Sequence, residues 1–208
     1  MTSQPLEVRQ RNVGPWQMNT YALVCPTTQS SVLIDPGDDP DILQEMLAGT
    51  TPIAILLTHT HSDHVGALAE MQKRLNVPLY AHANATHRDI HPDHTLAQGD
   101  TFKLSQHTLD VFYTPGHIDD QICFNVRGEP TVIVGDTIFA GGPGRTNSHA
   151  NFLVTLDTLR TIVLQWSDDS VCYPGHGPSF RLGDIRGAVE AFVARDHGDF
   201  FGDAEWQL

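Results

Sequence analysis

Basic residues are scarce in this chain and form no cluster. Against 25 Asp and Glu there are only 12 Lys and Arg among 208 residues, which gives a formal net charge of -13. Because nucleic acids and anionic membranes are bound by clustered Lys and Arg, this balance excludes both as expected partners. We expect a small-molecule partner instead, and an anionic one would need bound cations to reverse the local field.

Cysteines and long apolar runs are also few. Cys25, Cys123 and Cys172 are odd in number, widely spaced and free of any CxxC pattern. This argues against a disulfide framework and a thiolate zinc site, and predicts buried thiols in a reducing compartment. The N-terminal segment lacks the apolar core of a secretory signal, and no stretch approaches the roughly 18 apolar residues of a membrane span. We therefore expect a cytoplasmic protein.

The organisation of the chain predicts one domain over residues 1–208, since no repeat, low-complexity segment or Gly/Ser linker divides it. Short apolar runs of strand length alternate with segments of helical periodicity, which favours an α/β sandwich of sheets covered by helices. Strands are expected at 6–11, 21–25, 31–34, 52–57, 78–81, 109–113, 122–126 and 131–134, and helices at 41–47, 65–75, 151–166 and 184–195.

A histidine-rich segment follows the apolar run at 52–57. Its sequence THTHSDH holds His59, His61, Asp63 and His64. Alternate residues of an extended segment share a face, so His59 and His61 can approach one metal ion while the two later side chains turn toward another. Imidazole and carboxylate suit zinc, manganese or iron, and four-coordinate zinc would need further ligands from elsewhere in the chain.

Three further candidate ligands each follow a strand-like run beside a glycine. His117 stands in TPGH, Asp136 in GD and His176 in PGHG. Glycine permits turns that hold a ligand close to an ion, and proline fixes the approach of the chain. Any one of these residues could be a simple turn or cap residue, but all seven in this order indicate a site for two metals.

The motifs HxHxDH, TPGH, GD and PGHG, in this order, resemble the metallo-β-lactamase superfamily, and the resemblance begins at NTY (19–21) and IDPG (34–37). It implies an αββα sandwich with a metal site along one edge of the sheets. The implied cofactors are two divalent ions, with zinc expected and iron or manganese as alternatives. The resemblance assigns His59, His61 and His117 to the first metal, Asp63, His64 and His176 to the second, and Asp136 to both.

Within the superfamily, the stretch GDTIFAGGPGR at 135–145 most resembles the glyoxalase II group, the hydroxyacylglutathione hydrolases. This implies a metal-dependent hydrolase that cleaves a thioester, with a metal-bridging hydroxide as nucleophile oriented by Asp63 and Asp136. A basic residue at the place of Arg145 holds the glutathione backbone in that group, although Arg145 could equally be a structural turn residue. Asn147 stands where the group has a tyrosine, and we include it among the candidate substrate contacts.

The segment after His176 has room for about one helix, so the resemblance is to short, single-domain glyoxalase II-like proteins. Longer members carry a helical glutathione-binding domain there. We expect that a second copy of the chain, in a homodimer, could supply the missing cover.

Several alternatives stay open at this point. Persulfide dioxygenases form a related branch, and that resemblance would give a single iron held by His59, His117 and Asp136. A lactonase or other ester hydrolase could use the same two metals, although the 135–145 stretch favours neither. A non-catalytic metal-binding module would be expected to have lost ligands, whereas all seven are present.

The remaining histidines are interpreted as structural or solvated. His87, His91 and His94 lie in a polar segment, where solvated imidazoles are expected. His82 and His149 are better placed to line a pocket, but a structural role is preferred for both. The surface is the predicted location of His107 and His197.

Overall fold

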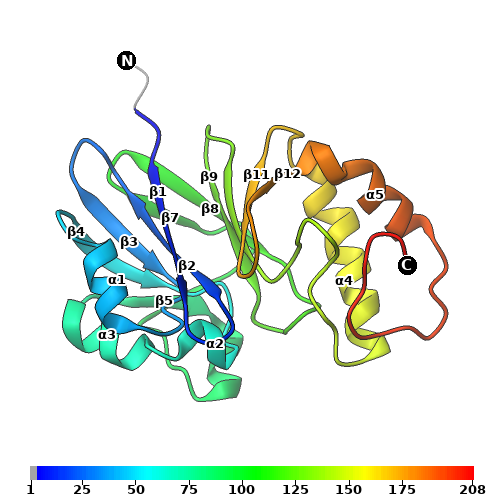
Figure 1. Ribbon diagram of the computed structural model, residues 1–208, viewed down its shortest axis with the longest axis horizontal. Helices are drawn as coiled ribbons and strands as arrows, with labels where there is room; N and C mark the ends of the chain where they lie inside the picture. Colours follow the sequence, from blue (N-terminus) through cyan, green and yellow to red (C-terminus); the bar gives the residue numbers. More distant parts are fainter. Residues whose placement is uncertain (1–3) are drawn as a thin grey trace.

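The computed structural model describes residues 4–208, and within this range twelve strands form two sheets that face each other (Figure 1). The first sheet has the order β1-β2-β3-β4-β5-β6, with parallel pairing from β3 onward. Its strands are β1 (Glu7–Val13), β2 (Met18–Val24), β3 (Ser30–Ile34), β4 (Thr51–Leu56), β5 (Leu79–His82) and β6 (His94–Leu96).

The second sheet has the order β12-β11-β10-β9-β8-β7 and is antiparallel except for the pair β10 and β11. Its strands are β7 (Thr101–Leu104), β8 (His107–Tyr113), β9 (Ile122–Val126), β10 (Thr131–Gly135), β11 (Val171–Pro174) and β12 (Phe180–Arg181).

Helices cover the outer face of each sheet (Figure 1). The first sheet carries α1 (Pro40–Met46), α2 (Ser62–Val65), α3 (Leu68–Leu75) and the 3-10 turn η1 (Ala83–Arg88). The second sheet carries α4 (His149–Thr161), the 3-10 turn η2 (Val163–Gln165) and α5 (Leu182–Ala194). The predicted αββα sandwich is confirmed, and no helix of residues 4–208 has the length and apolar character needed to cross a membrane.

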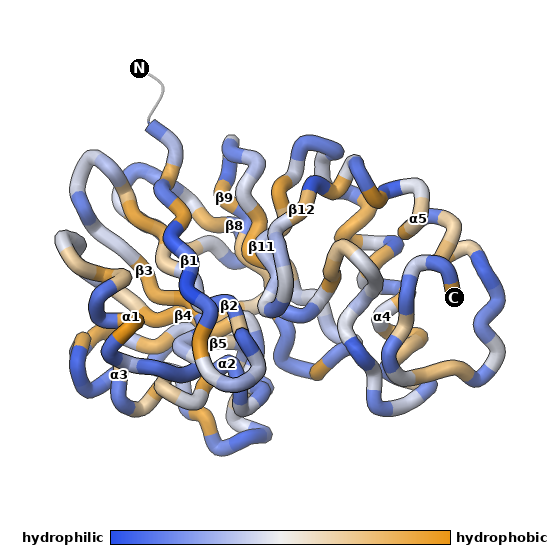
Figure 2. Tube along the Cα trace, in the orientation of Figure 1, coloured by the Kyte–Doolittle hydropathy of each residue, from blue (hydrophilic) through white to orange (hydrophobic). Residues whose placement is uncertain are grey.

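Side-chain alternation along the strands builds three apolar layers. In β4, Ala54 and Leu56 face the second sheet while Ile55 packs with α1 and α3. In β10, Ile133 faces the first sheet while its neighbours Val132 and Val134 pack under α4 and α5. Because both faces of these strands are largely buried, the strands are mainly apolar, and Figure 2 shows hydrophobic residues along β4.

Several expectations about individual elements are wrong. The helix predicted at 65–75 is two helices, since α2 ends at Val65 and α3 begins at Leu68. The helix predicted at 151–166 ends at Thr161 and is followed by η2. His107 is not a surface residue: it is 5% exposed and its Nδ1 lies 2.9 Å from Oε1 of Glu129. His197 is half-buried against the rings of Phe152 and Phe192.

Candidate metal centre

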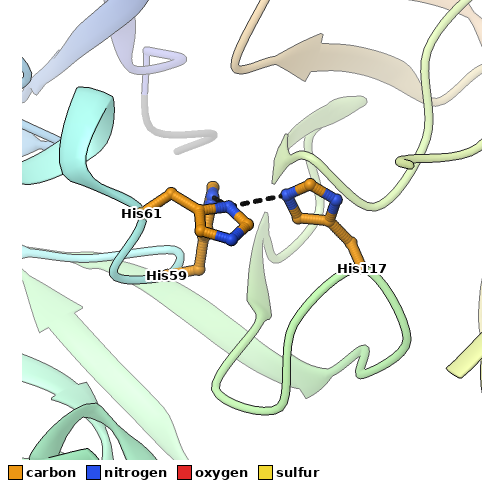
Figure 3. Close-up of side chains that lie close together, drawn as sticks. All are labelled: His59, His61 and His117. Carbon is orange, nitrogen blue, oxygen red and sulfur yellow. Dashed lines mark hydrogen bonds between the residues drawn. The ribbon is translucent and has the colours of Figure 1, made fainter. Parts of the chain in front are cut away.

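The loops that follow β4, β8, β10 and β11 meet at one edge of the sandwich. The first cluster there contains His59, His61 and His117 (Figure 3). Nδ1 of His61 lies 3.1 Å from Nε2 of His59 and 2.8 Å from Nε2 of His117. Ligands of a tetrahedral ion with bonds near 2.0–2.1 Å lie about 3.3 Å apart, so these three nitrogens converge as metal ligands do.

The second cluster contains Asp63, His64 and His176. Nε2 of His176 lies 3.0 Å from Oδ2 of Asp63, and Nε2 of His64 lies 3.9 Å from the same oxygen. His64 is completely buried, whereas Asp63 and His176 are partly exposed. The second position therefore has one face open to solvent.

Asp136 lies between the two clusters. Its Oδ2 atom is 3.5 Å from Nε2 of His117 and 3.8 Å from Nε2 of His176, while its Oδ1 atom is 3.4 Å from Nε2 of His64. One carboxylate thus faces ligands of both positions, as a bridging ligand would. The structure brings together all seven residues that the sequence singles out.

Two glycines make this close approach feasible. A Cβ atom on Gly175 would lie 2.2 Å from Oδ1 of Asp136 and 2.5 Å from Cε1 of His64. Gly135 has a φ of +49°, and a Cβ atom there would lie 2.5 Å from Oγ1 of Thr58. A side chain at either position would push the site apart, which explains the glycines next to the ligands.

The donor set fits divalent metal ions. Nε2 of His64 and Oδ1 of Asp136 are buried and have no hydrogen-bond partner within the described residues, a costly arrangement unless another group occupies the space between the clusters. Imidazole nitrogens with carboxylate oxygens suit zinc, iron or manganese. The residues present therefore meet the chemical requirement for a metal centre.

The protonation states of His59, His61 and Asp63 suit metal binding. Burial, together with repulsion from neighbouring histidines, lowers the pKa of His59 and lowers that of His61 to about 4. Both rings are then neutral at pH 7, the form that binds a metal ion. The hydrogen bond from His176 lowers the pKa of Asp63 to about 2, so this carboxylate is ionised.

Asp35 holds the candidate ligand His64 and the neighbouring Thr58 in place, although no role for it is predicted from the sequence. Its Oδ1 atom accepts a hydrogen bond from the backbone N–H of Thr58 at 2.7 Å, and its Oδ2 atom accepts from the Thr58 hydroxyl at 2.6 Å. Oδ2 also lies 3.0 Å from Nδ1 of His64. The available signal was its position directly after the apolar run of β3, the pattern shared by the ligands.

The segment around His176 is fixed by β2. The side-chain amide of Asn19 donates to the backbone oxygens of Pro174 at 2.9 Å and Gly177 at 2.8 Å, and the Tyr21 hydroxyl donates to Pro174 at 2.7 Å. These contacts span both sheets, so the turn that carries His176 is tied to the opposite half of the sandwich.

The two candidate substrate contacts lie on the loop beside His117. Nδ1 of His117 is 2.7 Å from the backbone oxygen of Arg145, which orients the imidazole. The Arg145 side chain is 64% exposed, and its Nε lies 3.5 Å from Oδ2 of Asp203 in the C-terminal segment. Asn147 is exposed on the same loop.

The C-terminal segment packs along this loop. The backbone N–H of Thr146 donates to the oxygen of Gly202 at 3.1 Å, and the N–H of Gly202 returns a bond to Oγ1 of Thr146 at 3.1 Å. The indole N–H of Trp206 donates to the oxygen of Ala140 at 2.9 Å. Chain that follows the last helix therefore supports the loop that carries Arg145.

With this geometry in place, comparison with known proteins decides the family. The model of the metallo-beta-lactamase superfamily matches residues 13–176. The chain belongs to this superfamily. Its members bind divalent metals and are largely hydrolases, in agreement with the His and Asp clusters described above.

Named relatives are consistent with this assignment. Over 82% of its length and 90% of the relative's, the chain is 30% identical to the probable metallo-hydrolase YqgX of Bacillus subtilis (strain 168). It is 37% identical to the hydroxyacylglutathione hydrolase of Buchnera aphidicola subsp. Schizaphis graminum (strain Sg), over 56% of this chain and 46% of that protein. The chain thus spans about half the length of that relative.

A solved structure shows the same fold. The crystal structure of BLEG-1 B3 metallo-beta-lactamase superimposes with a TM-score of 0.81 and 27% identity, over 87% of this chain and 97% of that one.

Proposed function

We propose that the protein is a dinuclear metal-dependent hydrolase that cleaves a thioester of the hydroxyacylglutathione type. The observation that carries this proposal is the placement of Asp136 between the two ligand clusters, with Oδ2 at 3.5 Å from His117 and 3.8 Å from His176. A shared carboxylate keeps two ions close enough to act on one reacting group.

The metal ions and the residues around them would have different roles in hydrolysis. Metal ions held there would lower the pKa of a bound water and polarise the substrate carbonyl. Asp63 is partly exposed and ionised, so its carboxylate can accept a hydrogen bond from a water at the open face of the second position and orient that water. A thioester releases a thiolate, which leaves without a dedicated general acid.

Arg145 supports an anionic substrate. Its guanidinium lies on the loop that orients His117 and is exposed, so it can pair with a carboxylate of the thiol portion. The similarity to a named hydroxyacylglutathione hydrolase agrees with this, and the likeness covers about half of that protein.

An exposed indole borders the second metal position. Trp16, in the turn between β1 and β2, is 74% exposed and lines a cavity of about 210 Å³ together with Ser62 and Asp63. An exposed indole next to a candidate ligand offers a platform for an apolar part of the substrate.

Elemental analysis of the purified protein, combined with an S-D-lactoylglutathione hydrolysis assay under air, tests the proposal. We expect close to two metal equivalents per chain and turnover that a chelator abolishes. Two bound metals without hydrolysis of any thioester would overturn the substrate assignment.

One subset of the ligands offers a second candidate reaction. His59, His117 and Asp136 could hold a single iron as two histidines and one carboxylate, and Asp136 lies 3.5 Å from His117. About one iron per chain, no hydrolysis, and oxygen uptake with glutathione persulfide would favour persulfide oxidation instead.

A further inference from the structure

A buried hydrogen bond joins the two segments that carry the ligands of the first metal position. The hydroxyl of Thr60 donates to Oδ2 of Asp120 at 2.6 Å, and the two residues are 4% and 1% exposed. Thr60 stands between His59 and His61, while Asp120 lies three residues after His117. The bond therefore spans the gap across which the three imidazoles converge.

Few other contacts could hold the segment of His59 and His61 against the segment of His117. The nearest backbone bond runs from the N–H of Ile122 to the oxygen of Thr58 at 2.8 Å, just before one segment and just after the other. Past Thr58 and Ile122 the two segments leave β4 and β9, and the imidazoles lie on these turns. The Thr60–Asp120 bond is thus the contact that restrains the two turns at the level of the metal position.

Asp120 is itself attached to a fixed support. Its neighbour Asp119 accepts hydrogen bonds from Arg88 at 2.6 Å through its side chain, and from the Tyr113 hydroxyl at 2.8 Å and the Asn84 amide at 2.9 Å through its backbone oxygen. These donors come from β8 and from η1, elements that do not carry a ligand. The segment of Asp119 and Asp120 is therefore anchored independently of any metal.

The second carboxylate oxygen of Asp120 is unpaired within residues 4–208. Oδ1 is buried without a hydrogen-bond partner among the described residues, and Nη1 of Arg88 lies 3.7 Å away. Burying a carboxylate in this way is costly. Such a cost at the edge of a metal centre is understandable where the carboxylate fixes the geometry of that centre.

We propose that Asp120 and Thr60 are positioning residues that set the separation of the His59–His61 and His117 segments and thereby the metal affinity of the first position. This inference rests on the proposed metal centre but not on the substrate. Neither side chain contacts a reacting group; both act through the imidazoles beside them.

Conservative variants of Thr60 test the proposal. Thr60→Val keeps the shape and removes the hydroxyl, whereas Thr60→Ser keeps the hydroxyl. Loss of an outer hydrogen bond to a ligand segment weakens metal binding by roughly 10–100-fold. In zinc competition titrations we expect Thr60→Val to weaken one of the two binding steps to this extent, while Thr60→Ser stays within about threefold of the wild type.

A second set of variants identifies the step and controls for stability. His176→Ala should weaken the other binding step, which assigns the step affected in Thr60→Val to the first position. Ser31→Ala removes a comparable hydrogen bond, in which the hydroxyl oxygens of Ser31 and Thr50 lie 2.8 Å apart. Ser31 is near the start of β3, whereas the metal centre lies beyond the end of this strand. We expect it to leave both zinc steps unchanged.

Urea unfolding of the metal-free variants separates positioning from general stability. The proposal would be overturned if Thr60→Val bound both zinc ions like the wild type, or if Ser31→Ala weakened zinc binding equally. Lower stability of metal-free Thr60→Val with unchanged zinc affinity would also overturn it. Because zinc binding is measured without substrate, a protein that hydrolyses no thioester leaves this test intact.

Discussion

Nδ1 of His64 lies 3.0 Å from Oδ2 of Asp35, and both side chains are buried at the end of β3 and the start of α2. Since Nδ1 is engaged there, Nε2 is the nitrogen turned toward Asp136 and the second metal position. Asp35 thus fixes the orientation of a candidate ligand without reaching the metal position itself.

Asp35→Asn should weaken metal binding at the second position by roughly 10–100-fold, because an amide is a weaker acceptor than a carboxylate for the imidazole N–H. A zinc competition titration measures the effect. Asp41→Asn, which alters an exposed carboxylate paired with Arg74, serves as the control. Equal affinities for Asp35→Asn and the wild type would show that His64 needs no such support.

The fold could be predicted because the buried strands are visible in the sequence as apolar runs of strand length. β4 and β10 are mainly apolar runs of strand length, and each ends close to a ligand of the site. The strands β6, β7 and β12 are not predicted, because runs of two to four residues are too short for their periodicity to be distinguished from that of a loop.

The ligands could be predicted from the sequence, but the residues that hold them could not. Each ligand is marked by its type and by a strand end. Asp35 shares both marks, but its supporting role follows from strand register, which no local pattern shows. The parallel pairing of β3 and β4 sets Ile34 opposite Leu56, which brings Asp35 beside Thr58. Similarly, the contact of His107 with Glu129 joins residues that no local pattern connects.

Asp136→Ala should cost the protein both metals and most of its activity, since this side chain faces ligands of both positions. We expect a loss of more than roughly 100-fold in kcat/KM, above the range for outer-sphere changes. His91→Ala, which changes a histidine that is 71% exposed and paired with Asp89, should behave like the wild type in elemental analysis and turnover. Equal losses of metal and activity in the two variants would contradict the assignment of Asp136 to the metal site.

Arg145→Ala should raise KM for S-D-lactoylglutathione by about 10-fold and change kcat little, because a guanidinium that pairs with a remote carboxylate contributes to binding rather than to the chemical step. Steady-state kinetics separate the two constants. Arg181→Ala removes another exposed arginine, paired with Asp169, and serves as the control. A fall in kcat alone would contradict a role of the Arg145 side chain in substrate binding.

Removal of the Asp203 carboxylate should change KM in the opposite direction to removal of the Arg145 side chain. Its carboxylate lies 3.5 Å from Nε of Arg145 and competes with an anionic substrate for the guanidinium. Asp203→Asn should therefore lower KM, by no more than about threefold because both side chains are exposed and such pairs are weak. The effect should vanish in the Arg145→Ala background, and a decrease that persists there would assign Asp203 a different partner.

Trp16→Ala should raise KM for thioesters with apolar acyl groups and leave the metal content unchanged. The indole is 74% exposed beside the second position, so it can stack on a substrate without supporting the core. Trp16→Phe should retain most of the binding. A parallel increase in KM for short polar and long apolar substrates would argue against an apolar platform.

Removal of metal should lower thermal stability as well as activity. Without metal, Nε2 of His64 and Oδ1 of Asp136 are buried and have no hydrogen-bond partner within residues 4–208. An ion that binds only the folded chain stabilises it by about 4 kcal/mol when its free concentration is a thousand times Kd. For a chain of this size that corresponds to an increase in Tm on the order of 10 °C. Differential scanning calorimetry before and after dialysis against a chelator measures this shift, and Asp136→Ala should show a much smaller one. An unchanged Tm in the wild type would mean that the clusters do not hold metal tightly, whatever their geometry.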